Sequence, residues 1–108
     1  MLWLAAALAL HGDLARDAFR RAIEAHRAEV VRCYQAELER RPQAQGKLVV
    51  VIDIAPGGAV DGASVQRDEV GGELASCVLA SIQAWKFPPP GELGISVSYP
   101  FLFRTDAK

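Results

Sequence analysis

The stretch from Cys77 to Phe103 limits the folds open to this chain more than any other part of the sequence. Its first half places apolar residues three and four positions apart, which is typical of an amphipathic helix. Three prolines from Pro88 end that helix, because proline lacks a backbone N–H and clashes with the preceding turn. Residues 95–103 then alternate between apolar and other side chains, which predicts a half-buried strand. A helix and a strand with one apolar face each must pack on one another and on an earlier part of the chain.

Length and composition indicate a single folded domain. The chain has 108 residues, enough for one hydrophobic core without a metal ion. Apolar residues make up 51% of it, which argues against disorder. The formal net charge of −1 gives no electrostatic reason to expect nucleic acid or an anionic membrane as a partner.

The sequence before the second helix predicts a long helix and a central strand. Asp13 is a suitable N-cap and Pro42 ends a helix, so we expect one long helix between them that protrudes at its N-terminal end. Residues 47–55 form a nearly continuous apolar run rich in β-branched side chains. This run indicates a strand in the middle of a sheet, buried on much of both faces.

A Pro-Gly-Gly turn joins this strand to a weaker one over residues 60–67, and a hairpin is the simplest interpretation. Val60 and Val65 are its expected anchors, and Gly62 is a candidate bulge. A second helix follows over residues 73–85.

The resulting order is helix, strand, strand, helix, strand. Placing the last strand beside the first gives an antiparallel three-stranded sheet of order 2-1-3, with the most apolar strand in the middle. We therefore predict an α+β fold with two helices on one face of the sheet.

Five aromatic residues are expected to join the helices to the sheet. Each lies on an apolar helical stripe, in the aromatic-proline segment, or on the apolar face of the last strand. These core anchors are Tyr34, Trp85, Phe87, Tyr99 and Phe101.

The two cysteines lie on the core-facing stripes of the two predicted helices. If the helices pack side by side, a disulfide between Cys33 and Cys77 is geometrically allowed. It would contribute roughly 4 kcal/mol in the chain-entropy model and would require an oxidising compartment. The alternative is a pair of buried free thiols acting as small apolar residues.

The residues give no positive sign of catalysis, a metal or a cofactor. His11 and His26 have no matching ligand cluster, and His26 is expected to be a half-buried structural histidine. Asp53 interrupts an apolar strand, but its neighbours face the other side, so we expect it on the open sheet face. Neither a catalytic triad nor a glycine-rich phosphate loop is visible, and the prediction is a protein that is not an enzyme and has no small-molecule substrate.

The first twelve residues are interpreted as a segment separate from the domain at 13–108. The first ten are apolar, too few to span a bilayer, and resemble the centre of a secretion signal without its positively charged start. They are expected to be a remnant of a signal or anchor. The alternative is that they extend the first helix.

Four short segments together resemble the C-terminal domain of TonB-type energy transducers. They are residues 46–47 before the apolar strand, residues 58–60, residues 82–88 and residues 97–103. The Trp-Lys-Phe-Pro stop and the Tyr-Pro-Phe-Leu-Phe ending are the most specific parts of a resemblance that covers about residues 17–103. The element at Cys33-Tyr34 and the second cysteine, Cys77, are more similar to the AgmX/PglI C-terminal domain of gliding-motility and related envelope proteins.

This resemblance implies a periplasmic, non-enzymatic domain that binds other envelope or outer-membrane proteins, anchored to the inner membrane through an N-terminal segment. In TonB-type domains an extended partner segment adds to the last strand. The chain departs from this family in lacking a full transmembrane helix and a proline-rich spacer. This departure argues against a role in energy transduction more than against the predicted fold. A different interpretation is a disulfide-stapled structural domain that forms a homodimer or larger oligomer through its first helix.

The position of a proline predicts which edge of the last strand is open. In an antiparallel strand, alternate residues direct their backbone groups to opposite sides. Pro100 has no N–H, so it should belong to the set that faces away from the first strand. The expected partner-binding edge is therefore Ser96, Ser98, Pro100 and Leu102.

Overall fold

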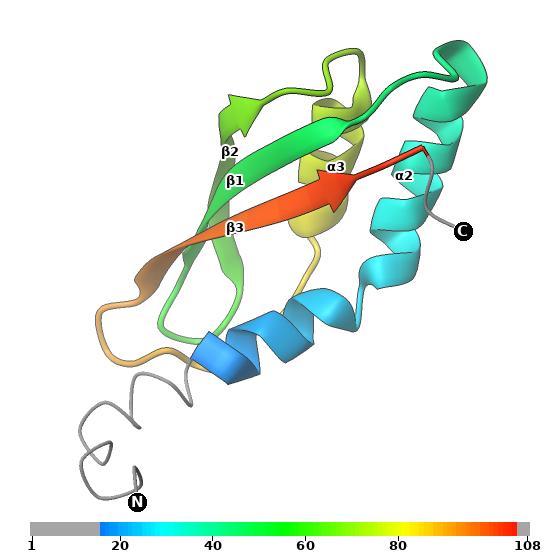
Figure 1. Ribbon diagram of the computed structural model, residues 1–108. Coiled ribbons are helices and arrows are strands. Elements are labelled where there is room, and N and C mark those ends of the chain that lie inside the picture. The colour runs from blue at the N-terminus through cyan, green and yellow to red at the C-terminus, as the bar shows by residue number, and fades with distance from the viewer. Residues whose placement is uncertain (1–15, 106–108) are drawn as a thin grey trace, which may run out of the picture.

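A computed structural model describes residues 16–105 as three helical segments and one antiparallel sheet of three strands (Figure 1). The strands lie in the order β2-β1-β3, so the predicted α+β class and the 2-1-3 order are confirmed. The elements in chain order are a helix over residues 16–24, α2 (Arg27–Arg40), β1 (Gly46–Ile54), β2 (Val60–Asp68), α3 (Leu74–Ile82) and β3 (Ile95–Phe103).

The helices cover one face of the sheet and leave the other open. Along β1, the even-numbered side chains from Leu48 to Ile54 are fully buried, whereas Val49 and Val51 are only half-buried. The expectation that β1 is buried on both faces is therefore wrong. Its β-branched residues on the open face are covered only by neighbouring strands, through cross-strand packing. Asp53 lies on this open face and is exposed, as expected.

The hairpin from β1 to β2 contains two irregularities. One register shift falls between Asp53 and Ile54 of β1, next to Gly62 of β2, where the sequence indicated a bulge. The second falls between Val49 and Val50 and was not expected. Val65 is 39% exposed, so it is not the core anchor that the sequence suggested.

The predicted long first helix is in fact two helices. The segment over residues 16–24 ends in a turn at Ala25 and His26, where the His26 N–H bonds to the Ile23 carbonyl at 3.0 Å, and α2 then begins. This bend brings helix 16–24 back towards the sheet (Figure 1), and it buries Phe19 and Ile23 in the core. Over residues 16–24 the helix therefore packs on the core instead of protruding, and oligomerisation through it stays a prediction. The expected cap at Asp13 and the segment 1–12 lie outside the described residues.

The aromatic-proline segment closes the core. Helix α3 ends at Ile82, three residues before the expected end, yet Trp85 is still 1% exposed because a turn directs its side chain inward. The Phe87 N–H bonds to the Gly58 carbonyl at 2.8 Å. Gly58 has a positive φ of 98°, and a Cβ atom there would collide with the Phe87 carbonyl oxygen, so glycine is required at this crossing.

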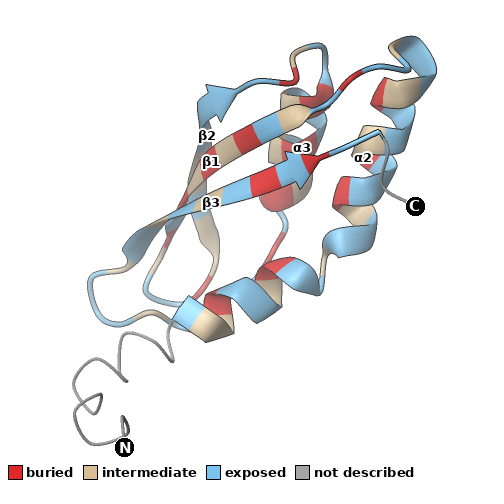
Figure 2. Cartoon of the chain, in the orientation of Figure 1, coloured by how far each residue is buried: buried red, intermediate tan, exposed pale blue. Residues whose placement is uncertain are grey.

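Burial along β3 is uneven. Figure 2 shows buried bands only towards its C-terminal end, where Phe101 and Phe103 join the core. Val97 and Tyr99 are half-buried, and Ile95 is 40% exposed. The helix-facing side of β3 is thus partly uncovered over its first half. Among residues 16–105, no helix is both long and apolar enough to cross a membrane.

Candidate partner-binding edge

Strand β3 is an outer strand of the sheet. It pairs with β1 from Ile95 to Phe103 without a register shift, and no strand of residues 16–105 pairs with its other side. An outer strand of this length leaves a row of backbone donors and acceptors open to another chain. The question is which residues supply them.

Hydrogen bonds at both ends of β1 answer this question. The Lys47 carbonyl accepts a bond from the Glu69 N–H at 2.9 Å, and the Ala55 N–H bonds to the Ala59 carbonyl at 2.8 Å. Odd-numbered residues of β1 therefore direct their backbone towards β2, and even-numbered residues direct theirs towards β3. Pro100 lies opposite the odd-numbered Val49, so its backbone faces away from β1.

The same parity applies to the other residues of the expected edge. Ser96, Ser98 and Leu102 lie opposite Asp53, Val51 and Lys47. Their N–H and C=O groups point to the open edge, whereas Val97, Tyr99 and Phe101 bond to β1. Pro100 offers only its carbonyl, so the stretch with both donors and acceptors is Ser96 and Ser98.

The side chains of this edge set lie on the open face of the sheet. The Ser96 hydroxyl donates to Asp53 Oδ1 at 2.5 Å, and the Ser98 hydroxyl donates to Gln66 Oε1 at 2.9 Å. These bonds occupy the hydroxyl groups and leave the backbone groups untouched. They also give Asp53 a structural partner on an exposed surface, which does not resemble a catalytic environment.

Two hollows lie on the other face of β3, between the strand and the helices. The first groove, of about 550 Å³, lies between helix 16–24 and residues 95–99. The second groove, of about 340 Å³, lies between α2 and residues 99–104. Ile23 and Tyr99 line both, so the two grooves meet at these side chains.

The five expected core anchors divide into two groups. Trp85, Phe87 and Phe101 are buried, whereas Tyr34 and Tyr99 are half-buried and line the second groove. The Tyr34 hydroxyl donates to the Ala44 carbonyl at 2.5 Å, and its ring lies 4.7 Å from that of Phe103. Tyr99 is therefore a groove wall as well as a packing residue.

A cluster at the bend between helix 16–24 and α2 was not foreseen from the sequence. The His26 ring stacks on the Trp85 indole, with ring centroids 4.6 Å apart and planes at 9°. Glu29 bonds to both, to His26 Nδ1 at 2.9 Å and to the Trp85 Nε1–H at 2.9 Å. Both bonds lower the pKa of Glu29, and the bond with His26 has the larger effect. Only the three-residue spacing of His26 and Glu29 hinted at a contact.

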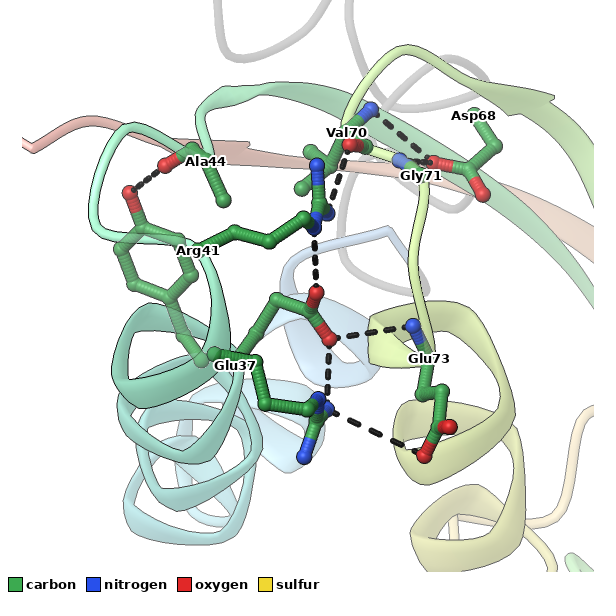
Figure 3. Close-up of polar contacts among 9 residues, drawn as sticks. Glu37, Arg41, Ala44, Asp68, Val70, Gly71 and Glu73 are labelled. Atoms are coloured by element: carbon green, nitrogen blue, oxygen red, sulfur yellow. Dashed lines mark hydrogen bonds and ion pairs between the residues drawn. The ribbon is translucent and has the colours of Figure 1, made fainter.

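A second cluster joins α2 to the loop before α3 (Figure 3), and of its contacts only the four-residue spacing of Glu37 and Arg41 was a signal in the sequence. The Glu37 side chain is 1% exposed, and its carboxylate accepts bonds from Arg41 Nε at 2.7 Å, Arg40 Nη2 at 2.6 Å and the Glu73 N–H at 3.0 Å. Arg41 also donates to the Val70 carbonyl at 2.9 Å. The pKa of Glu37 is lowered from 4.5 to about 2, mainly by the bond from Arg41 and next by the bond from Arg40. The cluster is fully paired and structural.

Cys33 of α2 and Cys77 of α3 form the disulfide that the sequence suggested, with their Cα atoms 5.7 Å apart. The expectation that both cysteines face the core is wrong for Cys77, which is exposed. It lies on the flank of α3 beside α2. Within residues 16–105 there is no group of three or more His, Cys, Asp or Glu side chains that could hold a metal ion.

The fold is a small α+β domain whose outer strand β3 has one unpaired edge within residues 16–105. The chain belongs to the family of Gram-negative bacterial TonB protein C-terminal domains, whose model matches residues 36–105. This family implies a periplasmic setting and a role in interaction with envelope proteins. Neither a curated protein nor a solved structure is significantly similar to the chain. Helix 16–24, His26, Glu29 and Cys33 all precede the matched region.

Proposed function

We propose that this domain binds an extended segment of another envelope protein, which adds to β3 as a fourth strand. The observation that carries the proposal is the outward direction of the Ser96 and Ser98 backbone, derived from the register of β1 and β3 and the bonds at the ends of β1. Strand addition uses such unpaired groups for affinity and alternate side chains for specificity.

Pro100 limits how far a partner can pair. Because it has no N–H, a partner strand finds a complete set of donors and acceptors only before this residue. The missing N–H of Pro100 also protects β3 from indiscriminate pairing with other open strand edges. We infer a short, specific contact rather than a long continuous ladder.

We also propose that the chain is closer to AgmX/PglI-type domains than to TonB itself, and that it works in a gliding-motility or related envelope complex. The disulfide between Cys33 and Cys77 supports this placement, because both cysteines belong to the elements that resemble that group. A disulfide between two helices also fits the oxidising periplasm. An anchor or signal in residues 1–12 remains part of the proposal.

Amide hydrogen exchange, followed by NMR, tests strand addition. The probe is a synthetic peptide of about nine residues that alternates threonine with valine or isoleucine and carries one glutamate. In the free domain the Ser96 and Ser98 N–H groups should exchange quickly, while those of Val97 and Tyr99 are protected. The peptide should protect Ser96 and Ser98. Binding without this protection, or no binding, would contradict the proposal.

A further inference from the structure

The disulfide between α2 and α3 borders a hollow on the surface of the domain. This disulfide hollow has a volume of about 380 Å³ and is lined by residues of α2, of α3 and of the N-cap of α3, namely Cys33, Ala36, Arg40, Glu73, Ser76 and Cys77. Cys77 is exposed, whereas Cys33 is only 4% exposed and belongs to the core. The two cysteines of one bond therefore differ in their access to solvent.

We propose that the disulfide hollow is a site of thiol–disulfide exchange, where a dithiol reductant cleaves the bond by attack on Cys77 Sγ. The inference does not depend on strand addition, because no residue of β3 lines this hollow. It assigns a chemical role to a surface formed partly by Cys33, which precedes the family match at residues 36–105.

The exchange proceeds in two balanced steps. A thiolate of the reductant bonds to Cys77 Sγ, the bond between Cys77 and Cys33 breaks, and Cys33 leaves as a thiolate. The second thiolate of the reductant then attacks the reductant's own first sulfur, and Cys77 leaves as a thiolate. The chain gains two electrons, and its two thiolates take up the two protons that the reductant lost. The reductant ends as a disulfide.

Access decides which sulfur is attacked. The incoming thiolate must lie in line with the S–S bond, on the far side of the sulfur that it attacks. Behind Cys33 this position is filled by the core, because Cys33 packs there. Cys77 lies on the exposed flank of α3, so the corresponding position is open to solvent. The reductant therefore attacks Cys77, and Cys33 is the leaving group.

The two helices stay in contact after reduction, because other contacts close to the disulfide also join them. Glu37 accepts a bond from the Glu73 N–H at 3.0 Å, and Arg41 donates to the Val70 carbonyl at 2.9 Å. Val78, which follows Cys77 in the chain, is fully buried in the core. We therefore expect the reduced domain to remain folded, at a lower stability than the oxidised form.

The position of Cys33 explains why the reductant must carry two thiols. The Cα atoms of the two cysteines are 5.7 Å apart, so the Cys33 thiolate stays within reach of Cys77 while the helices remain in contact. It can attack the mixed disulfide and expel a single thiol, which restores the original bond. A second thiol on the reductant competes with this return and completes the reduction.

A matched pair of variants tests the difference in access. Cys33→Ser leaves Cys77 as the only thiol of the chain, and Cys77→Ser leaves Cys33. In the folded chain Cys77 should react with dithionitrobenzoate at least about tenfold faster than Cys33, whereas the two thiols should react at similar rates in concentrated urea. Circular dichroism checks that both variants are folded, and the next experiment needs no variant. Equal rates in the folded chain, or a faster reaction of Cys33, would overturn the proposal.

The unaltered 108-residue chain identifies the attacked sulfur directly. Brief treatment with glutathione, followed by iodoacetamide, traps the mixed disulfide and alkylates the free thiol. Trypsin places the two cysteines on separate peptides, because it cuts after Arg32, Arg40 and Arg67. Mass spectrometry should find glutathione on Cys77 and the alkyl group on Cys33. Glutathione on Cys33, or no reaction of the folded chain, would overturn the proposal.

A comparison of reductants tests the need for two thiols. At equal thiol concentration, dithiothreitol should reduce the folded chain at least about tenfold faster than glutathione, as measured by the number of alkylated thiols. Reduction by reduced thioredoxin as well would support a protein dithiol as the source, and reduction by dithiothreitol alone would support a small dithiol. Equal rates with dithiothreitol and glutathione would overturn the dithiol requirement.

Discussion

The indole of Trp85 lies parallel to the imidazole of His26, and Glu29 bonds to both rings. Trp85 follows α3 and belongs to the segment that closes the core, whereas His26 is the N-cap of α2. The contact therefore joins the aromatic-proline segment to the bend between two helices. It lies at the turn where helix 16–24 meets α2.

Loss of Trp85 should unfold the domain or nearly do so. Replacement of a buried tryptophan by alanine typically lowers the free energy of unfolding by about 3 to 5 kcal/mol, and Trp85→Ala also leaves Glu29 and His26 without their shared partner. Thermal melting measures the change. Trp85→Phe is the control, because it keeps a ring but removes the indole N–H, and it should lose about 1 to 3 kcal/mol. A sharp transition within a few degrees of the parent for Trp85→Ala would contradict this role.

The bend at Ala25 and His26 illustrates what the sequence could not predict. Neither proline nor glycine occurs between Asp13 and Arg41, and the apolar spacing runs through the bend. The break exists because a straight helix would leave Phe19 and Ile23 without apolar neighbours. We attribute the break between the two helices to tertiary packing and not to local helix preference.

The strands were easier to predict than the polar clusters. The alternation of apolar with other side chains predicted the bounds of β3 and its two faces. The missing N–H of Pro100 predicted which residues of β3 direct their backbone groups away from β1. The four-residue spacing of Glu37 and Arg41 indicated their ion pair, but the bond from the Glu73 N–H to Glu37 could not be predicted, because the two residues are far apart along the chain and no local pattern links them. The two grooves could not be predicted from the sequence, because they depend on helix 16–24 lying beside β3, whereas the sequence predicts a straight helix that protrudes.

The disulfide should supply a large part of the stability. Cys33 and Cys77 are 44 residues apart, and the chain-entropy model gives roughly 4 kcal/mol for a loop of this size. The double variant Cys33→Ala/Cys77→Ala should therefore unfold at a clearly lower urea concentration. Reduction of the parent should produce a similar shift. If the reduced parent and the double variant unfold at the parent's original midpoint, the crosslink is not stabilising.

Acid should weaken the domain through Glu37. Its pKa is lowered from 4.5 to about 2 in the folded state, so its contribution to stability is complete above about pH 4.5 and is lost as the pH falls towards 2. Glu37→Gln should be less stable than the parent at neutral pH, and this difference should shrink across that window. Urea unfolding at several pH values measures it. Glu39→Gln, at an exposed position on the same helix, removes a carboxylate without breaking the bonds of Glu37 and is the control.

Two proline substitutions at adjacent residues of β3 test the direction of its backbone. Val97 lies opposite Ile52 and bonds to β1, so Val97→Pro removes a bond of the sheet and should lower the melting temperature by at least about 10 °C. Ser98 faces the open edge, so Ser98→Pro should stay within about 5 °C of the parent but lose binding of the alternating peptide. If Ser98→Pro unfolds the domain while Val97→Pro is tolerated, the strand has the opposite orientation. If Ser98→Pro folds and binds normally, a partner does not pair with this edge.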